Sequence, residues 1–256
     1  MSRSVGIVIP AYEPSVERLV SYVEAIDAAI EPTAIRVEID DPDEDVLDAL
    51  CGTVATVRAV DARGGKGAAI TRGFETLSTD VLAFADADGS TAAESLADVI
   101  APTAEGRADL AVGSRRHPDA DIRSHQTFAR RGLGDVFAAL ARRTLGVDLH
   151  DFQCGAKAMT QGAWSRVRGE IYEGGFAWDI EVIAMAAAGG ERIVEVPVAW
   201  TDYPDSTVST VNATVELGTT LLASRYRAGR PEDDRLAGSL PSSRSTALVD
   251  RVARDD

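Results

Sequence analysis

The chain has 256 residues, 45% of them apolar, which is enough to bury one sizeable α/β core. Its formal net charge of −15 argues against a nucleic-acid-binding protein, because a charge of this sign repels phosphate backbones. No apolar run approaches the roughly 18 residues that a membrane span needs, and no signal peptide opens the chain. We therefore expect a soluble or peripheral protein. Cys51 and Cys154 lie far apart without metal-ligand spacing, which predicts reduced core residues of a cytosolic protein.

Apolar segments and amphipathic segments alternate along the chain. Strands alternating with helices at this spacing predict parallel βαβ units, with ligand-binding loops at the carboxyl ends of the strands. Strands are predicted over 4–10, 34–41, 55–62, 81–85, 109–115 and 191–203, and helices over 15–30, 44–50, 65–77 and 161–167.

The stretch VLAFADADGST, residues 81–91, ends an apolar strand with two carboxylates two residues apart, Asp86 and Asp88. Thr91 and Glu94 are predicted to form a capping box for the following helix, which would hold the carboxylates on a short loop. Carboxylate oxygens suit Mg²⁺ or Mn²⁺, with nucleotide phosphates as further ligands. The alternative is a solvated acidic turn, which is common in a chain this rich in aspartate.

Two other strand ends carry residues that suit a nucleotide. Tyr12 and Glu13 follow Pro10, and Asp40 and Asp41 end the second strand, where carboxylates can accept hydrogen bonds from the N–H groups of a base. Acidic strand ends are also ordinary solubility devices, so both interpretations stay open at this point.

Lysine occurs only twice among the 26 basic residues, as Lys66 in the glycine-rich turn DARGGKG and as Lys157 in DFQCGAK. Both are candidate phosphate or sugar contacts. Gly67 and its neighbours allow close backbone approach, and the helix that opens after Lys66 presents free N–H groups to an anion. The turn lacks the spacing of a Walker A loop.

The charge balance reverses between Arg115 and Arg143, where seven arginines face three aspartates. Residues 127–145 have the pattern of an amphipathic helix with arginines at its flanks. Such a helix fits a membrane surface, and it fits a protein core equally well, since periodicity does not separate the two.

Eight motifs occur in an order that resembles the dolichyl-phosphate sugar synthases, within the family 2 glycosyltransferases. The resemblance spans residues 4–225 and implies one α/β domain of the nucleotide-binding GT-A type at 1–229, with a mostly parallel sheet flanked by helices. A flexible acidic tail is expected at 230–256. The abundance of acidic residues also resembles proteins of salt-loving archaea. The motifs are IPAY, the pair Asp40 and Asp41, GKGAA, DADGS, GSR, DFQCGAK, FAWDIE and EVPVAW.

The resemblance implies inverting transfer of a hexose from a nucleotide sugar to a polyprenyl phosphate, with Mg²⁺ or Mn²⁺ as cofactor. UDP-glucose is the first choice of donor and GDP-mannose the second. Asp179 is the expected base if the acceptor is a hydroxyl group. The expected metal ligands are Asp86, Asp88 and Ser90, the acceptor-phosphate contacts Arg115, Arg123, Arg130 and Arg131, and the donor-sugar contacts Asp151, Gln153, Lys157, Trp178 and Glu181.

The expected place of action is the cytoplasmic face of the cell membrane, with the protein bound peripherally and engaged in protein N-glycosylation or other surface glycans. Two other enzymes share the architecture: a family 2 glycosyltransferase with a hydroxyl acceptor, and a sugar-1-phosphate nucleotidyltransferase. The second usually has a glycine-rich basic loop after its first strand, which IPAYEPS lacks. A non-catalytic binding relative is a third alternative, and retention of both carboxylates of the DxD pair argues against it.

Overall fold

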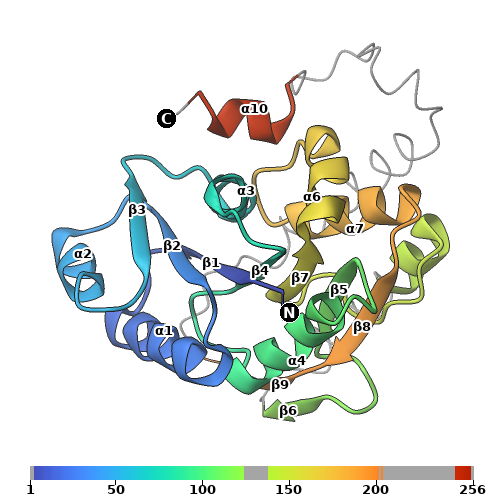
Figure 1. Cartoon of the computed structure of the whole chain (residues 1–256), viewed down its shortest axis with the longest axis horizontal. Helices are drawn as coiled ribbons and strands as arrows, with labels where there is room; N and C mark the ends of the chain where they lie inside the picture. Colours follow the sequence, from blue (N-terminus) through green and yellow to red (C-terminus); the bar gives the residue numbers. More distant parts are fainter. Residues whose placement is uncertain (1–2, 124–137, 202, 204–245, 255–256) are drawn as a thin grey trace.

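A seven-stranded sheet organises the chain in a computed structural model that describes residues 3–123, 138–201, 203 and 246–254 (Figure 1). The strand order is β3-β2-β1-β4-β7-β5-β8, and every neighbouring pair is parallel except those of β7, which runs antiparallel to β4 and β5. The predicted mostly parallel sheet is therefore confirmed. The strands are β1 (Val5–Tyr12), β2 (Ala34–Asp40), β3 (Thr56–Val60), β4 (Val81–Ala85), β5 (Leu110–Ser114), β7 (Ala156–Thr160) and β8 (Ile193–Pro197).

Helices cover both faces of this sheet (Figure 1). One face carries α1 (Val16–Ile30), α2 (Glu44–Leu50) and α4 (Ala93–Ala104), and the other carries α3 (Lys66–Thr76), α6 (Gln161–Val167), the short 3₁₀ helix η1 (Arg168–Glu170), α7 (Trp178–Ala188) and α10 (Leu248–Val252). A further helical segment at 138–145 is the described part of the helix predicted over 127–145. Among the described residues, no helix is both long and apolar enough to cross a membrane.

Two apolar clusters, one on each face, follow from the alternation of side chains along the strands. Val8 and Phe84 point into the cluster with α3 and α7, whereas Ile7 and Ile9 point into the cluster with α1 and α4. Because both faces are covered, the central strands read as continuous apolar runs. Because helices pack on both faces, the ends of the strands are held in place, and the loops that follow them start from fixed positions.

The carboxyl ends of β1, β2, β4 and β5 lie at one edge of the sheet, and β7 starts at the same edge because it runs the other way. Register shows this directly, since Ala85 at the end of β4 pairs with Ala156 at the start of β7. The strand order reverses between β1 and β4, and a ligand crevice opens at such a switch point in α/β sheets.

Two local predictions are wrong. Helix α4 begins at Ala93 with Ala92 as its N-cap and no side-chain cap, so Thr91 and Glu94 form no capping box. Thr91 instead makes an isolated bridge with Trp200. The strand predicted over 191–203 is divided into β8 and β9 (Ala199–Thr201), and β9 pairs with β6 (Asp121–Arg123) as a separate two-stranded sheet.

The C-terminal segment is partly packed, so the prediction of a flexible tail is wrong for residues 246–254. Helix α10 lies across α3 (Figure 1), and its Leu248 and Val252 are buried in the core on that face. The backbone N–H of Leu248 donates to Ile171 O at 2.7 Å. Residues 230–245 lie outside the described residues. The cysteine prediction is half right, since Cys154 is buried and Cys51 is exposed.

Candidate active site

The DxD carboxylates stand at the carboxyl end of β4, as predicted. Asp86 has a side chain that is 39% exposed, and its backbone N–H donates to Gly155 O at 2.9 Å. A Cβ atom on residue 155 would lie only 2.0 Å from Asp86 Oδ2. Only glycine therefore lets the start of β7 pass beside this carboxylate, and Gly155 is a site residue that the sequence alone did not indicate.

Asp88 is held by Ser90, whose backbone N–H donates to Asp88 Oδ1 at 2.9 Å. Burial, and then the neighbouring carboxylate of Asp86, raise the pKa of Asp88. The hydrogen bond that Ser90 makes to this carboxylate comes from its backbone. Metal coordination by Ser90 stays a prediction.

The carboxylate pair fits a divalent cation on its own chemistry. Hard oxygen ligands at a partly open position suit Mg²⁺ or Mn²⁺, which commonly take one or two carboxylates and complete their shell with phosphate and water. No group of three or more candidate metal ligands occurs among the described residues, in line with an ion that needs the nucleotide for its remaining ligands. Beside the pair, the buried hydroxyl of Tyr22 has no hydrogen-bond partner within the described part of the chain and lies in the field of Asp86 and Asp88.

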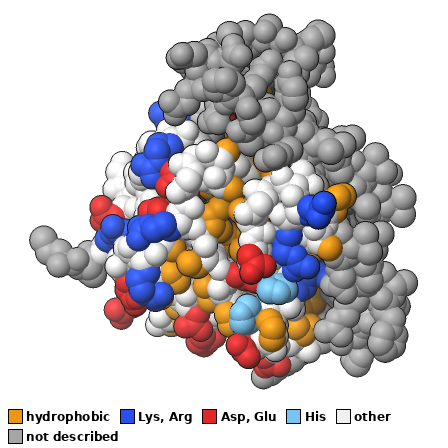
Figure 2. Space-filling view, turned by 90° about the vertical axis from the view of Figure 1, so that its right-hand side faces the viewer, with side chains coloured by type: hydrophobic (Ala, Val, Ile, Leu, Met, Phe, Trp, Pro, Cys, Tyr) orange, Lys and Arg blue, Asp and Glu red, His pale blue; other side chains and the backbone are white. Residues whose placement is uncertain are grey.

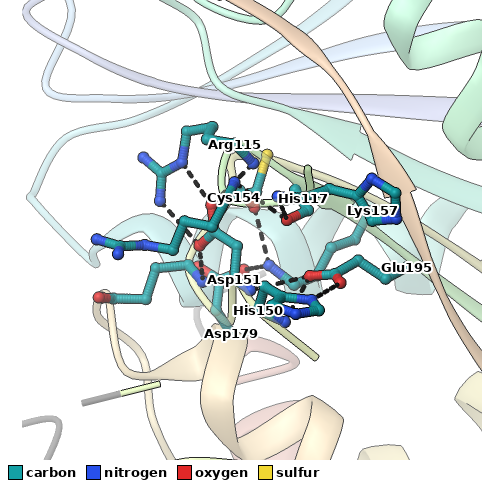
Figure 3. Close-up of polar contacts among 11 residues, drawn as sticks. Arg115, His117, His150, Asp151, Cys154, Lys157, Asp179 and Glu195 are labelled. Carbon is teal, nitrogen blue, oxygen red and sulfur yellow. Dashed lines mark hydrogen bonds and ion pairs between the residues drawn. The ribbon is translucent and has the colours of Figure 1, made fainter. Parts of the chain in front are cut away.

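Both lysines of the chain bind one carboxylate, that of Asp179 at the start of α7. Lys157 Nζ lies 2.6 Å from Asp179 Oδ1, and Lys66 Nζ lies 3.2 Å from Asp179 Oδ2 and 2.8 Å from Asp86 Oδ1 (Figure 3 shows Lys157 and Asp179). Burial by itself lowers the pKa of Lys66, but the carboxylates of Asp179 and Asp86 outweigh it and raise the pKa. Lys66 therefore stays charged and links the DxD pair to α7.

This arrangement bears on two predicted roles. Asp179 is 2% exposed and each of its oxygens holds an ammonium group, so the prediction that it is a free base for a hydroxyl acceptor is wrong for this structure. Lys157 is 2% exposed and donates to Asp179 and to Cys154 O, so its ammonium group is engaged inside the protein. A contact with the donor sugar stays a prediction.

The glycine-rich turn before α3 is built by Asp40. Asp40 Oδ2 accepts from the backbone N–H groups of Gly64 and Gly65 at 2.8 and 2.9 Å, and Oδ1 accepts from Arg72 Nη2 at 2.6 Å. Asp40 is only 2% exposed, so it shapes the nucleotide-side loop and is not available to a base. Gly67 is equally constrained, because a Cβ there would lie 2.5 Å from Trp178 Cβ.

The remaining nucleotide-side residues line the switch point. Pro10 is buried in β1, Tyr12 ends that strand with its ring 4.0 Å from the guanidinium of Arg63, and Glu13 follows it. Glu13 and Asp41 are exposed and have positive φ angles of 45° and 49°. Two non-glycine residues at the ends of adjacent strands thus have left-handed backbone conformations. Such strained conformations cluster at ligand-binding sites.

Arg115 stands at the end of β5 and is fixed by Asp151 (Figure 3). Its Nε and Nη2 lie 2.7 and 3.0 Å from the two oxygens of Asp151, a forked pair. Burial by itself lowers the pKa of Arg115, and the carboxylate of Asp151 outweighs it and raises the pKa. A guanidinium carries five N–H donors, and among the described residues only Asp151 accepts hydrogen bonds from that of Arg115, whose side chain is 27% exposed.

Several predicted sugar contacts lie in the protein interior. Trp178 is 1% exposed and its Nε1 donates to Thr71 Oγ1, while Glu181 is 0% exposed and accepts from Tyr172 N and Glu173 N. Neither side chain is accessible to a sugar in this conformation, so the structure does not support these two roles, which stay predictions.

Asp151 is likewise only 2% exposed, and both of its oxygens are occupied by Arg115. Its predicted sugar contact likewise has no support from this structure and stays a prediction. Gln153 is half-buried, and its backbone N–H donates to Asp151 Oδ1. Arg123 ends β6, and Arg130 and Arg131 lie outside the described residues.

The fold and this site together define a GT-A-type nucleotide-binding domain. The glucosyl-3-phosphoglycerate synthase of Mycobacterium tuberculosis, solved with Mn²⁺, UDP-glucose and phosphoglyceric acid, superposes with a TM-score of 0.64 at 17% identity. The alignment covers 90% of this chain and 81% of that one. The same synthase has been solved with Mg²⁺ and UDP.

The chain belongs to the glycosyl transferase family 2, whose sequence profile matches residues 7–167. It is 30% identical over 229 residues to "Glycosyltransferase AglD" of Haloferax volcanii, covering 85% of this chain and 36% of that protein. It is 30% identical over 207 residues to a polyprenol monophosphomannose synthase of Mycolicibacterium smegmatis, covering 77% of each. The chain spans about a third to a half of several of these relatives, including the dolichyl-phosphate beta-glucosyltransferase of Dictyostelium discoideum at 51%.

Proposed function

We propose that the protein is a metal-dependent, inverting glycosyltransferase that moves a hexose from a nucleotide sugar to a polyprenyl phosphate. The observation that carries the proposal is Arg115, a partly exposed guanidinium fixed in place by Asp151 and within the field of Asp86. The forked edge of Arg115 binds Asp151, and the N–H groups that do not face Asp151 suit an anionic acceptor. The relatives support the same acceptor class, because their names include polyprenol monophosphomannose and dolichyl-phosphate glucose transfer.

In the proposed reaction an acceptor phosphate oxygen attacks the anomeric carbon, and the bond from that carbon to the nucleotide diphosphate breaks. Asp86 and Asp88 would hold a divalent cation, whose charge would offset the charge of the departing diphosphate. Lys66 lies next to Asp86 and supplies a second positive charge on the leaving-group side. Arg115 holds the attacking phosphate. A phosphate dianion attacks without a general base, since the second pKa of a phosphate monoester is about 6.

The state of Asp179 favours a phosphate acceptor over a hydroxyl acceptor. A hydroxyl acceptor needs a base within reach of its proton. Asp179 is buried between two ammonium groups, so the carboxylate expected for that role is occupied.

UDP-glucose is the proposed first donor and GDP-mannose the second, as the dolichyl-phosphate glucosyltransferase relatives suggest. We propose action at the cytoplasmic face of the membrane, with peripheral attachment. Arg123, Arg130 and Arg131 are proposed as further contacts for the acceptor phosphate.

A donor panel tests the proposal. Purified protein is incubated with each radiolabelled nucleotide sugar, farnesyl phosphate or dolichyl phosphate, and Mn²⁺ or Mg²⁺, and lipid-linked sugar is extracted and counted. We expect label from one donor only, and loss of label with EDTA. The Asp88→Asn variant should lose at least a hundredfold in rate, while the matched surface variant Asp98→Asn, on the exposed side of α4, keeps it. Transfer in the presence of chelator by Asp88→Asn would contradict the metal role, and transfer to hydroxyl acceptors alone would contradict the phosphate acceptor.

A further inference from the structure

Two loops on the acceptor side of the site each carry one histidine. The loop after β5 contains Arg115 and His117, and it is tied down by Ser114, whose buried Oγ accepts from the N–H groups of Arg116 and His117 at 3.2 and 3.0 Å. The loop before β7 contains His150 and Asp151. The rings of His117 and His150 meet edge to face, with centroids 6.2 Å apart.

Glu195 in β8 organises the second loop (Figure 3). Its Oε1 accepts from the backbone N–H groups of His150 and Asp151 at 2.7 and 3.0 Å, and its Oε2 lies 2.7 Å from His150 Nδ1. Because Asp151 in turn holds the guanidinium of Arg115, one nearly buried carboxylate fixes both an imidazole and the turn that orients the arginine. Glu195 is therefore a positioning residue for both groups.

The Nδ1 atoms of both rings are engaged, which assigns their tautomers. His150 Nδ1 faces a carboxylate, so it carries the proton and donates to Glu195. His117 Nδ1 accepts from the backbone N–H of Asp119 at 3.2 Å, so its proton lies on Nε2. The Nε2 atoms of both rings have no hydrogen-bond partner among the residues that the structure describes. The side chains are 28% and 41% exposed, and histidines lie together at the surface in Figure 2.

A guanidinium in the same loop favours an anion as the ligand. Arg115 is two residues from His117, and its partner Asp151 follows His150 directly. Glu195 faces Nδ1 of His150 and not Nε2, and Asp119, whose carboxylate is 3.7 Å from His117 Nδ1, is 81% exposed to solvent. Imidazole nitrogens beside a fixed guanidinium are suited to the oxygens of a phosphate.

We propose that His117 and His150 complete the acceptor-phosphate site, with the Nε2 atom of each ring in contact with phosphate oxygens beside Arg115. The inference rests on the proposed phosphate acceptor and assigns it two residues outside the motif set of the sequence. His117 donates from Nε2 to the phosphate, and His150, oriented by Glu195, donates from Nε2 to the dianion when its ring carries both protons.

Imidazole NMR tests the site without turnover, because the chain has only three histidines, His117, His125 and His150, which single substitutions to glutamine assign. In ¹⁵N-histidine-labelled protein we expect a protonated Nδ1 for His150 and a protonated Nε2 for His117. Farnesyl phosphate should shift the Nε2 signals of both rings, and inorganic phosphate should do so at higher concentration. UDP with Mg²⁺ should leave both unchanged. Three outcomes would overturn the inference. Shifts with UDP but not with farnesyl phosphate would place the rings at the donor site, and shifts with inorganic phosphate alone would indicate a site for free phosphate. No shift with any of these ligands would show that the rings bind no phosphate.

Kinetics supply the second arm. His117→Gln and His150→Gln should each raise the KM for farnesyl phosphate about tenfold, the effect of losing one charge-assisted hydrogen bond, with the KM for the donor within twofold. Asp98→Asn is the matched control. An unchanged KM for farnesyl phosphate in both variants would overturn the inference while leaving the proposed function intact. Absence of any transfer to farnesyl phosphate by the wild type, with the NMR shifts present, would overturn the proposed function alone.

Discussion

Among single residues, Gly155 places the tightest limit on the metal-binding side chain. Its missing Cβ leaves room for Asp86 Oδ2, which would lie 2.0 Å from a methyl group at that position. Gly155→Ala should therefore push the carboxylate aside and weaken Mn²⁺ binding by about ten- to a hundredfold, the usual effect of disturbing the support of a metal ligand. Titration of Mn²⁺ followed by EPR, with UDP present, measures the affinity of each variant for the metal ion.

The matched control is Gly169→Ala in η1, where a Cβ would meet no atom within 4 Å. It should bind Mn²⁺ like the wild type. Equal Mn²⁺ affinity for the two variants would mean that Asp86 has space to move and that Gly155 is not part of the site.

The lysine pair on Asp179 makes a stability prediction. Lys157 is 2% exposed, and replacing it by methionine leaves Asp179 buried with only Lys66 as its counter-charge. Breaking a buried ion pair on one side costs about 3 kcal/mol, so the free energy of unfolding of Lys157→Met should fall by roughly that amount. Urea denaturation followed by circular dichroism measures the loss.

Arg192→Met is the comparison for this prediction, because Arg192 pairs with Asp109 at the surface with 56% of its side chain exposed. Exposed pairs are worth at most about 1 kcal/mol. If both variants lost the same free energy, the ion pair of Lys157 would contribute no more than a surface contact.

The sequence predicts the position of a site residue where the pattern is local. It does not predict which side chains are paired with residues from distant segments. Asp86 and Asp88 follow an apolar strand directly, and that pattern placed them correctly at the edge of the sheet. Asp151 and Glu181 looked alike in the sequence as acidic residues in motifs, but Asp151 pairs with Arg115, 36 residues away. Which carboxylates are consumed inside the protein depends on tertiary contacts that spacing does not encode.

At the scale of elements, α10 alters the domain boundary. It is five residues long, too short to be stable alone, so its order depends on Leu248 and Val252 in the core. Leu248→Ala should lower the free energy of unfolding by about 2–3 kcal/mol, as for other buried leucines. Deleting residues 246–256 should have at least this effect, contrary to expectation for a flexible tail.

Arg254→Ala provides the control, because Arg254 follows α10 and is exposed. Its thermal unfolding should match that of the wild type. A deletion variant with the stability of the full chain would restore the boundary at residue 229.

Element prediction succeeded for the regular βαβ units, in which strand and helix periods differ clearly. It missed β7 altogether, because the short run AKAMT is poor in the β-branched and aromatic residues that indicate a strand. It also missed α10. This helix buries only two side chains among charged neighbours, which is too few to show the helical period of apolar residues.

For the whole molecule, the net charge of −15 implies self-repulsion that salt should relieve. The screening length falls from about 10 Å at 0.1 M salt to about 3 Å at 1 M, so most of this repulsion disappears within that range. We expect the melting temperature to rise by about 5 °C between 0.1 and 1 M KCl, equivalent to about 1–2 kcal/mol for a chain of this size.

Salt can also stabilise by exclusion from the protein surface, and the shape of the curve separates the two effects. Charge screening levels off once the screening length is shorter than the spacing of surface charges, whereas exclusion keeps growing with concentration. The melting temperature should therefore climb steeply below about 1 M KCl and then flatten, and sucrose should give only a shallow, even slope. A straight rise with KCl that sucrose reproduces would show that repulsion among the acidic side chains does not limit the stability of this protein.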